Sequence, residues 1–162
     1  MIRPARPDDI PALLAIWNPL IRDTMVTFAS LLKTPDDLQQ MLETKRREGH
    51  AFLVAEIGGQ VGGFATYGPF RNGNGYRFSM EHTIILGTEA RGRGLGRGLI
   101  EGLCQHGRAA GVHSLLAGVS SGNPDGVAFH SALGFNLVAR IPEVGHKFDK
   151  WWDLILMQKI LT

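Results

Sequence analysis

The sequence predicts one α/β domain in which a mixed, mostly antiparallel sheet of about seven strands carries helices on both faces. A meander of three strand-like runs, joined by glycine-rich turns, predicts antiparallel neighbours. A strand–turn–helix–strand unit follows it, and a helical crossover of this kind joins parallel strands. The 162 residues suffice for one domain with a core and are too few for two. We therefore expect residues 1–162 to form a single domain.

The first third of the chain predicts a short strand and two helices. The strand covers residues 2–5, and the first helix begins near residue 10, where apolar side chains start to recur at helical spacing. The second helix covers residues 34–48 and has a capping threonine and a proline at its start. Residues 20–33 have no clean period, so we expect a loop or irregular helix there. Such a segment often forms a pocket wall, and Phe28 is one of its candidates.

The remaining elements are predicted from apolar patterns and from the glycines and prolines that mark the turns between them. In order, we expect strands over residues 51–57, 60–67 and 76–86, a helix over 99–110, a strand over 113–119, a helix over 126–133, and strands over 135–141 and 151–160. A long excursion separates the last two strands in this prediction.

Composition and charge exclude several classes of protein. Hydrophobic residues make up 44% of the chain and charged residues 20%, and no apolar run approaches the ~20 residues of a membrane span. A net charge of +2 is too small to indicate nucleic-acid binding. The first residues lack the apolar core of a signal peptide, and the only cysteine, Cys104, cannot form an intramolecular disulfide. We therefore expect a cytoplasmic protein that binds neither membranes nor nucleic acids.

A glycine- and arginine-rich turn between a strand and a helix predicts a site for a phosphate or pyrophosphate group. Every second residue from 92 to 98 is glycine, so no side chain stands over those backbone N–H groups. The following helix adds its unpaired N–H groups and the positive end of its dipole. Arg91, Arg93 and Arg97 add full positive charge. The alternative is a glycine-rich turn whose arginines are simply solvated.

The order of residues in this turn discriminates between phosphate-binding loops. The dinucleotide fingerprint requires glycine where Arg97 stands, and the P-loop requires a Gly-Lys-Ser/Thr tripeptide, which the chain lacks. The pattern Arg/Gln-x-x-Gly-x-Gly/Ala matches residues 91–96. This turn resembles the acetyl-CoA pyrophosphate loop of the GNAT superfamily of N-acetyltransferases, whose element order the chain also shares. The resemblance implies acetyl-CoA as co-substrate, bound by Ile84, Ile85, Leu86, Arg91, Gly92, Arg93, Gly94, Leu95, Gly96 and Arg97.

Acetyl transfer to an amine requires a group that accepts a proton from the ammonium. An amine with a pKa of ~8–10 is largely protonated at neutral pH, and a nearby carboxylate can take the proton directly or through a water. Glu81, in the strand that leads to Arg91, is the natural candidate. The alternative is a carboxylate that pairs with Arg77 or His82.

Residues 123–135 match a second part of the superfamily pattern. There, an asparagine after the fifth strand contacts the cofactor, and a tyrosine seven residues later faces the thioester sulfur. Here Asn123 occupies the first position and His130 the second. An imidazole with a pKa near ~6.5 can donate a proton to a thiolate. We expect Asn123 to bind the cofactor and His130 to be catalytic, with a packing or hydrogen-bonding histidine as the alternative.

Three segments narrow the resemblance to one branch. Residues 80–84, 130–135 and 145–153, the last reading Gly-x-Lys-x-x-x-Trp-x-Asp, resemble the phosphinothricin and methionine sulfone/sulfoximine N-acetyltransferases. This resemblance implies direct attack in a ternary complex, Glu81 as the base, and a homodimer. It also implies a small α-amino acid as substrate, with a tetrahedral sulfur or phosphorus at the end of its side chain.

The oxyanions of such a substrate are suited to guanidinium donors. Arg71 and Arg77, which precede Glu81, are the candidates, and Phe28 can close the pocket. The alternatives are solvent-exposed arginines and a core phenylalanine. The other histidines show no metal-ligand spacing, so we expect no metal.

Two further functions fit the same patterns. One is a GNAT acetyltransferase for a protein N-terminus or a polyamine, although a polyamine site should be rich in carboxylates. The other is a non-catalytic acyl-CoA-binding module, and the presence of Glu81 argues against it.

Overall fold

Seven strands form one sheet in the computed structural model, which describes residues 1–162. The strands are β1 (Ile2–Pro4), β2 (Phe52–Ile57), β3 (Gln60–Pro69), β4 (Ser79–Leu86), β5 (Ser114–Ser120), β6 (Asn136–Lys147) and β7 (Lys150–Ile160). Their order across the sheet is β1-β2-β3-β4-β5-β7-β6. Only β4 and β5 pair in parallel, so the predicted mixed and mostly antiparallel sheet is confirmed.

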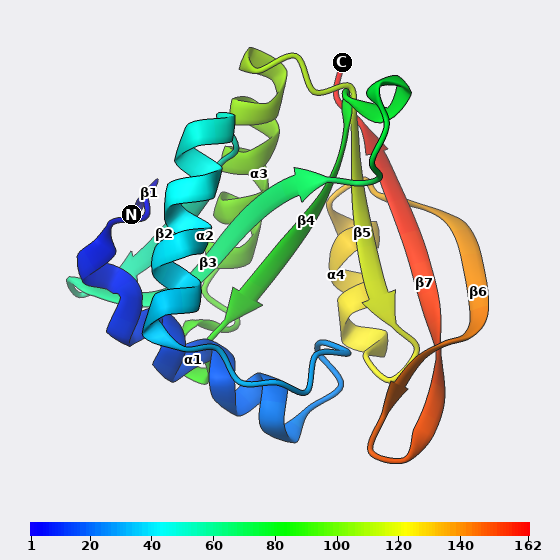
Figure 1. Ribbon diagram of the computed structural model, residues 1–162, viewed down its shortest axis with the longest axis horizontal. Coiled ribbons are helices and arrows are strands. Elements are labelled where there is room, and N and C mark those ends of the chain that lie inside the picture. Colours follow the sequence, from blue (N-terminus) through cyan, green and yellow to red (C-terminus); the bar gives the residue numbers. More distant parts are fainter.

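Four α-helices cover the two faces of the sheet (Figure 1). They are α1 (Ile10–Asp23), α2 (Pro35–Glu48), α3 (Leu95–Ala109) and α4 (Pro124–Ala132). Helices α1 and α2 pack on one face through a cluster that includes Leu13, Leu38 and Phe64. Helices α3 and α4 pack on the other face through a larger cluster that includes Leu103 and Leu133. The sheet is therefore buried on both sides. No helix is long and apolar enough to cross a membrane.

Three predicted boundaries are wrong, each for a local reason. The strand expected from residue 76 begins at Ser79, because Asn74–Tyr76 form a short 3-10 helix. The helix expected from residue 99 begins at Leu95, directly after Gly94, whose φ of 76° ends the preceding turn. The excursion expected after residue 141 is strand: β6 continues to Lys147 and forms a hairpin with β7.

The strands β4 and β5 pair over only part of their length. Residues Ser79–His82 pair with Ser114–Ala117, and no pairing continues beyond them. The remaining half of each strand still pairs on its other side, β4 with β3 and β5 with β7. Figure 1 shows the two strands diverging toward their carboxyl ends. The sheet is thus split in its middle, between two strands that each keep one partner.

Asp9 directly precedes α1 and connects it to β1. Its side chain makes no cap hydrogen bond to α1. Instead its two oxygens accept a bidentate pair from Arg3 at 2.9 and 2.8 Å, and one of them also accepts from the Arg6 N–H at 2.7 Å. These bonds hold the pKa of the Asp9 carboxyl below its usual range, the Arg3 hydrogen bond being the largest cause. The pair fastens β1 to the start of α1.

The first prediction concerns this ion pair. Asp9→Asn is expected to lower the free energy of unfolding at pH 7 by about 2 kcal/mol, since it removes one of the two carboxylates that pair with the Arg3 guanidinium, the other being Glu56. Because the native pKa is lowered, the stabilisation is present above the unfolded pKa of about 3.9 and is lost as the pH falls through the native pKa. Urea unfolding at pH 7 and at successively lower pH should show the wild-type advantage shrinking. A difference that stays constant with pH would contradict this account.

Candidate active site

A cavity of about 810 Å³ lies where β4 and β5 part. Residues 26–29 of the α1–α2 loop (residues 24–34) wall one side, and the cradle, residues 91–97 between β4 and the first turn of α3, provides another. Most of the predicted site residues line it: Phe28, Glu81, Ile84, Ile85, Leu86, Arg91, Gly92, Gly94, Gly96, Arg97, Asn123 and His130. Segments spread over most of the chain therefore meet at one opening in the sheet.

Glu81 reaches the cavity from β4. Successive side chains of a strand point to opposite faces, and Glu81 shares the face of Ile85, which packs with α1 and α2. Its Oε2 atom lies 2.8 Å from the point that a Cβ on Gly118 of β5 would occupy. Any residue other than glycine at position 118 would therefore force the Glu81 side chain to move. Burial alone raises the pKa of the Glu81 carboxyl. The alternative in which Glu81 pairs with Arg77 or His82 is not what the structure has: Arg77 donates to the Asn74 carbonyl and His82 contacts His130.

His82, one residue later, faces the opposite side and meets α4. Its Nε2 atom lies 2.9 Å from Nε2 of His130, and Nδ1 of His130 lies 2.7 Å from the Gly126 carbonyl oxygen. Both rings are buried, with 6% of each residue exposed. Burial lowers the pKa of His82 to about 3, helped by the neighbouring His130, and burial also lowers the pKa of His130. Both imidazoles are therefore neutral at pH 7.

The hydrogen bonds define the tautomer of each ring. Because a carbonyl oxygen only accepts, His130 must carry its proton on Nδ1 and donate it to Gly126. Nε2 of neutral His130 is then an acceptor, and His82 donates to it. Donation to a thiolate from His130 would require one of these bonds to break. The alternative prediction, a hydrogen-bonding histidine that ties α4 to β4, describes this arrangement.

The cradle has the geometry of an anion site. Gly92 and Gly94 have φ values of 72° and 76°, which favour glycine, and a Cβ on either would meet no atom within 4 Å. The space over the turn is thus open, and the first N–H groups of α3 face it without intrahelical partners. Arg91 and Arg97 line the cavity, whereas Arg93 is exposed elsewhere and Leu95 packs against the core. A pyrophosphate fits this combination of backbone donors, open space and positive charge.

Asn123 serves the fold as well as the cavity. It is the N-cap of α4, and its Oδ1 atom accepts from the Gly126 N–H at 3.2 Å. This bond uses only Oδ1 and leaves the Nδ2 group free to donate, and the residue lines the cavity. The predicted contact to a cofactor therefore has a free donor available.

The structure does not bring Arg71 and Arg77 to the cavity. The Arg71 guanidinium lies 5.2 Å from the centre of the Tyr76 ring, and that of Arg77 lies 4.4 Å from the centre of the Phe78 ring. Both residues belong to the exposed β3–β4 connection rather than to the strand that carries Glu81. The arginines in the lining are those of the cradle, Arg91 and Arg97.

Several lining residues are absent from the sequence-based prediction. They include Thr83, Gly118, Ser120, Phe129 and Leu154. Thr83 has a signal in the sequence, because it shares the strand face of Glu81. The others depend on which elements become neighbours in space, and spacing along the chain does not reveal that. No group of three or more His, Cys, Asp or Glu side chains is arranged to hold a metal ion.

The second prediction concerns Glu81. Burial disfavours its charged form, so its carboxyl should titrate above the usual glutamate pKa of about 4.3. Carbon-13 NMR titration of the glutamate carboxyl groups measures this midpoint, and Glu81→Gln identifies the signal. A midpoint at or below the usual value would mean that the carboxyl is solvated or paired in solution.

The chain is similar to known acetyltransferases in sequence and in structure. The acetyltransferase (GNAT) family model matches residues 17–135. The L-methionine sulfoximine/L-methionine sulfone acetyltransferase of Pseudomonas aeruginosa is 38% identical over 161 residues, which cover 97% of this chain and 92% of that protein. The predicted resemblance to this branch is confirmed.

Two solved structures agree with this result. The ribosomal-protein-alanine N-acetyltransferase from Brucella melitensis has a TM-score of 0.96 at 42% identity, with 99% of each chain covered. A phosphinothricin acetyltransferase from Sinorhizobium meliloti, solved in complex with acetyl-CoA, has a TM-score of 0.94 at 30% identity, with 99% of this chain and 88% of that chain covered. With a family model over residues 17–135 and relatives aligned along almost its whole length, the chain belongs to the GNAT family of acetyltransferases.

Proposed function

We propose that this protein transfers the acetyl group of acetyl-CoA to the α-amino group of a small amino-acid analogue of the methionine sulfone, methionine sulfoximine or phosphinothricin type. One observation carries the proposal. One cavity, in the split of the sheet, is lined both by Glu81, a half-buried carboxylate without a hydrogen-bond or ion-pair partner, and by the open glycine–arginine cradle. A base for an ammonium and a site for a pyrophosphate are the two things that this reaction asks of the protein.

The cradle and the free half of β4 would hold the cofactor. Backbone N–H groups of residues 92–97 and the guanidinium groups of Arg91 and Arg97 bind the pyrophosphate. Ile84, Ile85 and Leu86 offer backbone groups to the pantetheine arm, since β5 no longer pairs with that part of β4. When bound, acetyl-CoA supplies an acetyl group activated as a thioester.

Glu81 would act as the base. Burial raises the pKa of the Glu81 carboxyl, which makes its carboxylate a better proton acceptor than an exposed one. It takes a proton from the substrate ammonium, and the freed lone pair on nitrogen attacks the acetyl carbon. The carbon–nitrogen bond forms and the carbon–sulfur bond breaks. The nitrogen then loses its second proton, and the departing thiolate takes up one proton to become the CoA thiol. For His130 we propose that it holds α4 against β4 beside the reaction, since both its ring nitrogens are already bonded.

The lining near Glu81 favours a small substrate. Leu20, Val26, Phe28 and Leu154 supply apolar surface, and hydroxyl groups come from residues such as Thr27. Glu81 and the exposed Asp125 are the only carboxylates in the lining, fewer than the several expected for a polyamine. A protein N-terminus is the second candidate, because the Brucella structure bears the name of a ribosomal-protein-alanine N-acetyltransferase.

The third prediction tests this function by thiol release from acetyl-CoA. The panel consists of L-methionine sulfone, L-methionine sulfoximine, L-phosphinothricin, spermidine and a peptide that begins with alanine. Turnover is expected for the amino acids, and Glu81→Gln should lower kcat at least about 100-fold while binding acetyl-CoA as the wild type does. Turnover of the peptide alone would show that the substrate is a protein N-terminus and not an amino-acid analogue. Acetyl-CoA binding without turnover in any arm would favour a binding module.

We also propose that the protein works as a cytoplasmic homodimer. The strand β6 lies at the edge of the sheet, and an exposed apolar edge invites pairing with another chain. Exposed apolar side chains gather on β6 and β7: Leu137, Val138, Ile141, Val144, Trp151 and Ile160. A second copy covering them would remove this surface from water.

The fourth prediction concerns this edge. Light scattering coupled to size exclusion should give the mass of a dimer for the wild type. Leu137→Lys should shift the mass toward the 17.7 kDa of one chain, because it places a charge on the apolar edge. Leu31→Lys, at a leucine that is exposed in the α1–α2 loop, is the matched control. A monomeric wild type would refute the dimer.

A further inference from the structure

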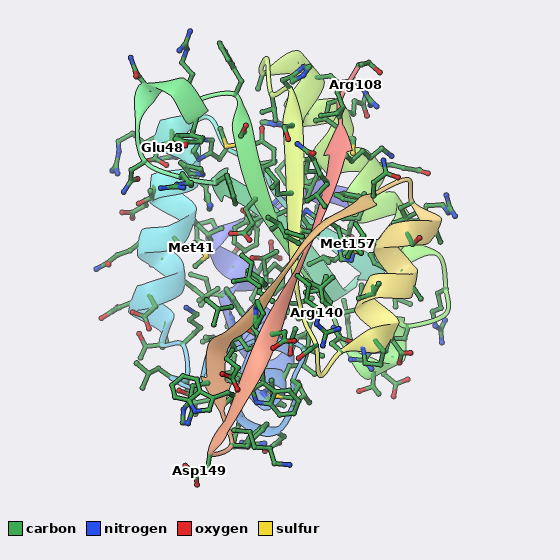
Figure 2. All side chains as sticks on the ribbon, turned by 90° about the vertical axis from the view of Figure 1, so that its right-hand side faces the viewer. Met41, Glu48, Arg108, Arg140, Asp149 and Met157 are labelled. Carbon is green, nitrogen blue, oxygen red and sulfur yellow. The ribbon has the colours of Figure 1, made fainter.

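The tip of the β6–β7 hairpin is the part of the molecule that the mechanism leaves unexplained. It carries the Gly-x-Lys-x-x-x-Trp-x-Asp run of residues 145–153. Figure 2 shows this tip, marked by Asp149, reaching past the other strands. None of these residues lines the cavity. Two of them, Gly145 and Lys147, contact the α1–α2 loop, whose residues do line the cavity.

Lys147 makes the main connection. It is only 4% exposed, and its Nζ atom donates to the Thr24 carbonyl at 2.7 Å and to the Thr27 carbonyl at 2.8 Å. The two threonines in turn shape the loop, since their hydroxyl oxygens accept from the N–H groups of Val26 and Ala29. One side chain from the hairpin thus fixes the backbone on both sides of the turn that leads to Phe28.

An ammonium group is a costly way to hold a loop. Lys147 has no carboxylate partner, and burial lowers its pKa. An apolar side chain of similar size would fill the same space without the cost of desolvating a charge. The ammonium adds what an apolar side chain cannot: two directional bonds to carbonyl groups three residues apart. The contact is therefore suited to fixing the position of the loop rather than to raising overall stability.

Two glycines complete the contact by allowing close approach. A Cβ on Gly145 would lie 2.6 Å from two atoms of the Phe28 ring. A Cβ on Gly122 would lie 2.8 Å from Cβ of Met25 and 3.0 Å from the Trp152 ring. Trp152 is itself held by a bond from its Nε1 to the Lys147 carbonyl at 2.9 Å. The hairpin tip and the end of β5 are thus shaped around the side chains of the loop.

We propose that Gly145, Lys147 and Trp152 form a clasp that shapes the substrate end of the cavity. Lys147 is a positioning residue for the α1–α2 loop. Gly145 is a determinant of specificity, because its lack of a side chain leaves room for the Phe28 ring. The inference rests on the proposed function, since it assigns a role to the wall against which the amino acid binds. Lys147 acts through the loop and touches neither substrate nor cofactor.

The fifth prediction compares Lys147→Met with Lys147→Arg and with Lys150→Met, a matched control at an exposed lysine of the same hairpin. Lys147→Met should raise KM for the amino acid about tenfold or more, because both carbonyl bonds are lost, while KM for acetyl-CoA stays within about twofold. Lys147→Arg should restore part of the loss, and Lys150→Met should behave as wild type. Equal losses in all parameters, or an unchanged amino-acid KM, would overturn the inference.

Hydrogen exchange separates this inference from the proposed function. In Lys147→Met, the amides of residues 24–29 should exchange faster than in the wild type, whatever amine is acetylated. If the wild type acetylates no amino acid of the panel, the substrate assignment fails, but the exchange experiment still tests the clasp. Unchanged exchange of these amides in Lys147→Met would overturn the clasp as well. Faster exchange with an unchanged amino-acid KM would also overturn it.

A double-mutant cycle tests Gly145 without removing a charge. Gly145→Ala should alter the relative kcat/KM for the sulfone and the phosphinothricin by several-fold, since the added methyl group displaces the Phe28 ring. In a Phe28→Leu background the same change should have a smaller effect, because the colliding ring is gone. Additive effects of the two substitutions would show that Gly145 and Phe28 are not coupled.

Discussion

The structure depends on the point at which β4 and β5 stop pairing. Parallel strands in the middle of a sheet normally exchange hydrogen bonds along their length, and leaving buried backbone groups without partners is costly. Here pairing ends at His82 and Ala117, so the following residues have one free edge each. Because β3 and β7 continue to support the outer edges, the split does not unravel the sheet. Backbone donors and acceptors are thereby kept for a ligand in the centre of the protein.

The alternation of β4 divides the chemistry between the two faces of the sheet. Glu81 points to the side of α1 and α2, while His82 points to the side of α3 and α4, where it meets His130. This follows from the geometry of a strand, in which successive side chains point to opposite faces of the sheet. The Glu81 carboxylate and the buried histidine pair thus approach the split from opposite sides. Each keeps its own environment, and burial acts on both by favouring the neutral form.

The sequence predicts much of this arrangement, and its errors have physical causes. Periodicity and turn residues identify all seven strands and the four helices, because both depend on neighbours within a few residues. The left-handed Gly94 at the start of α3 and the hairpin turn at Phe148 and Asp149, both with positive φ, are backbone conformations that residue types alone did not reveal. The sequence pattern puts Arg77 in the strand of Glu81 and Arg71 just before it, whereas β4 begins only at Ser79 and both arginines lie in the exposed connection that precedes it. Proximity in sequence to Glu81 then suggested a proximity in space that the 3-10 turn at Asn74–Tyr76 prevents.

The two ends of the cavity differ in how they are assembled, and this difference bears on specificity. The cradle and the free half of β4 form one continuous stretch, so a local pattern such as residues 91–96 is enough to identify the cofactor end. The other end, walled by the α1–α2 loop, joins segments that are far apart in the chain: Lys147 and Thr27 are 120 residues apart, and Phe28 packs against Gly145. Contacts of this kind can change one segment at a time without disturbing the cradle. The relatives are named for acetyl transfer to different amines, and such a division lets the loop end differ among them while the cradle is kept.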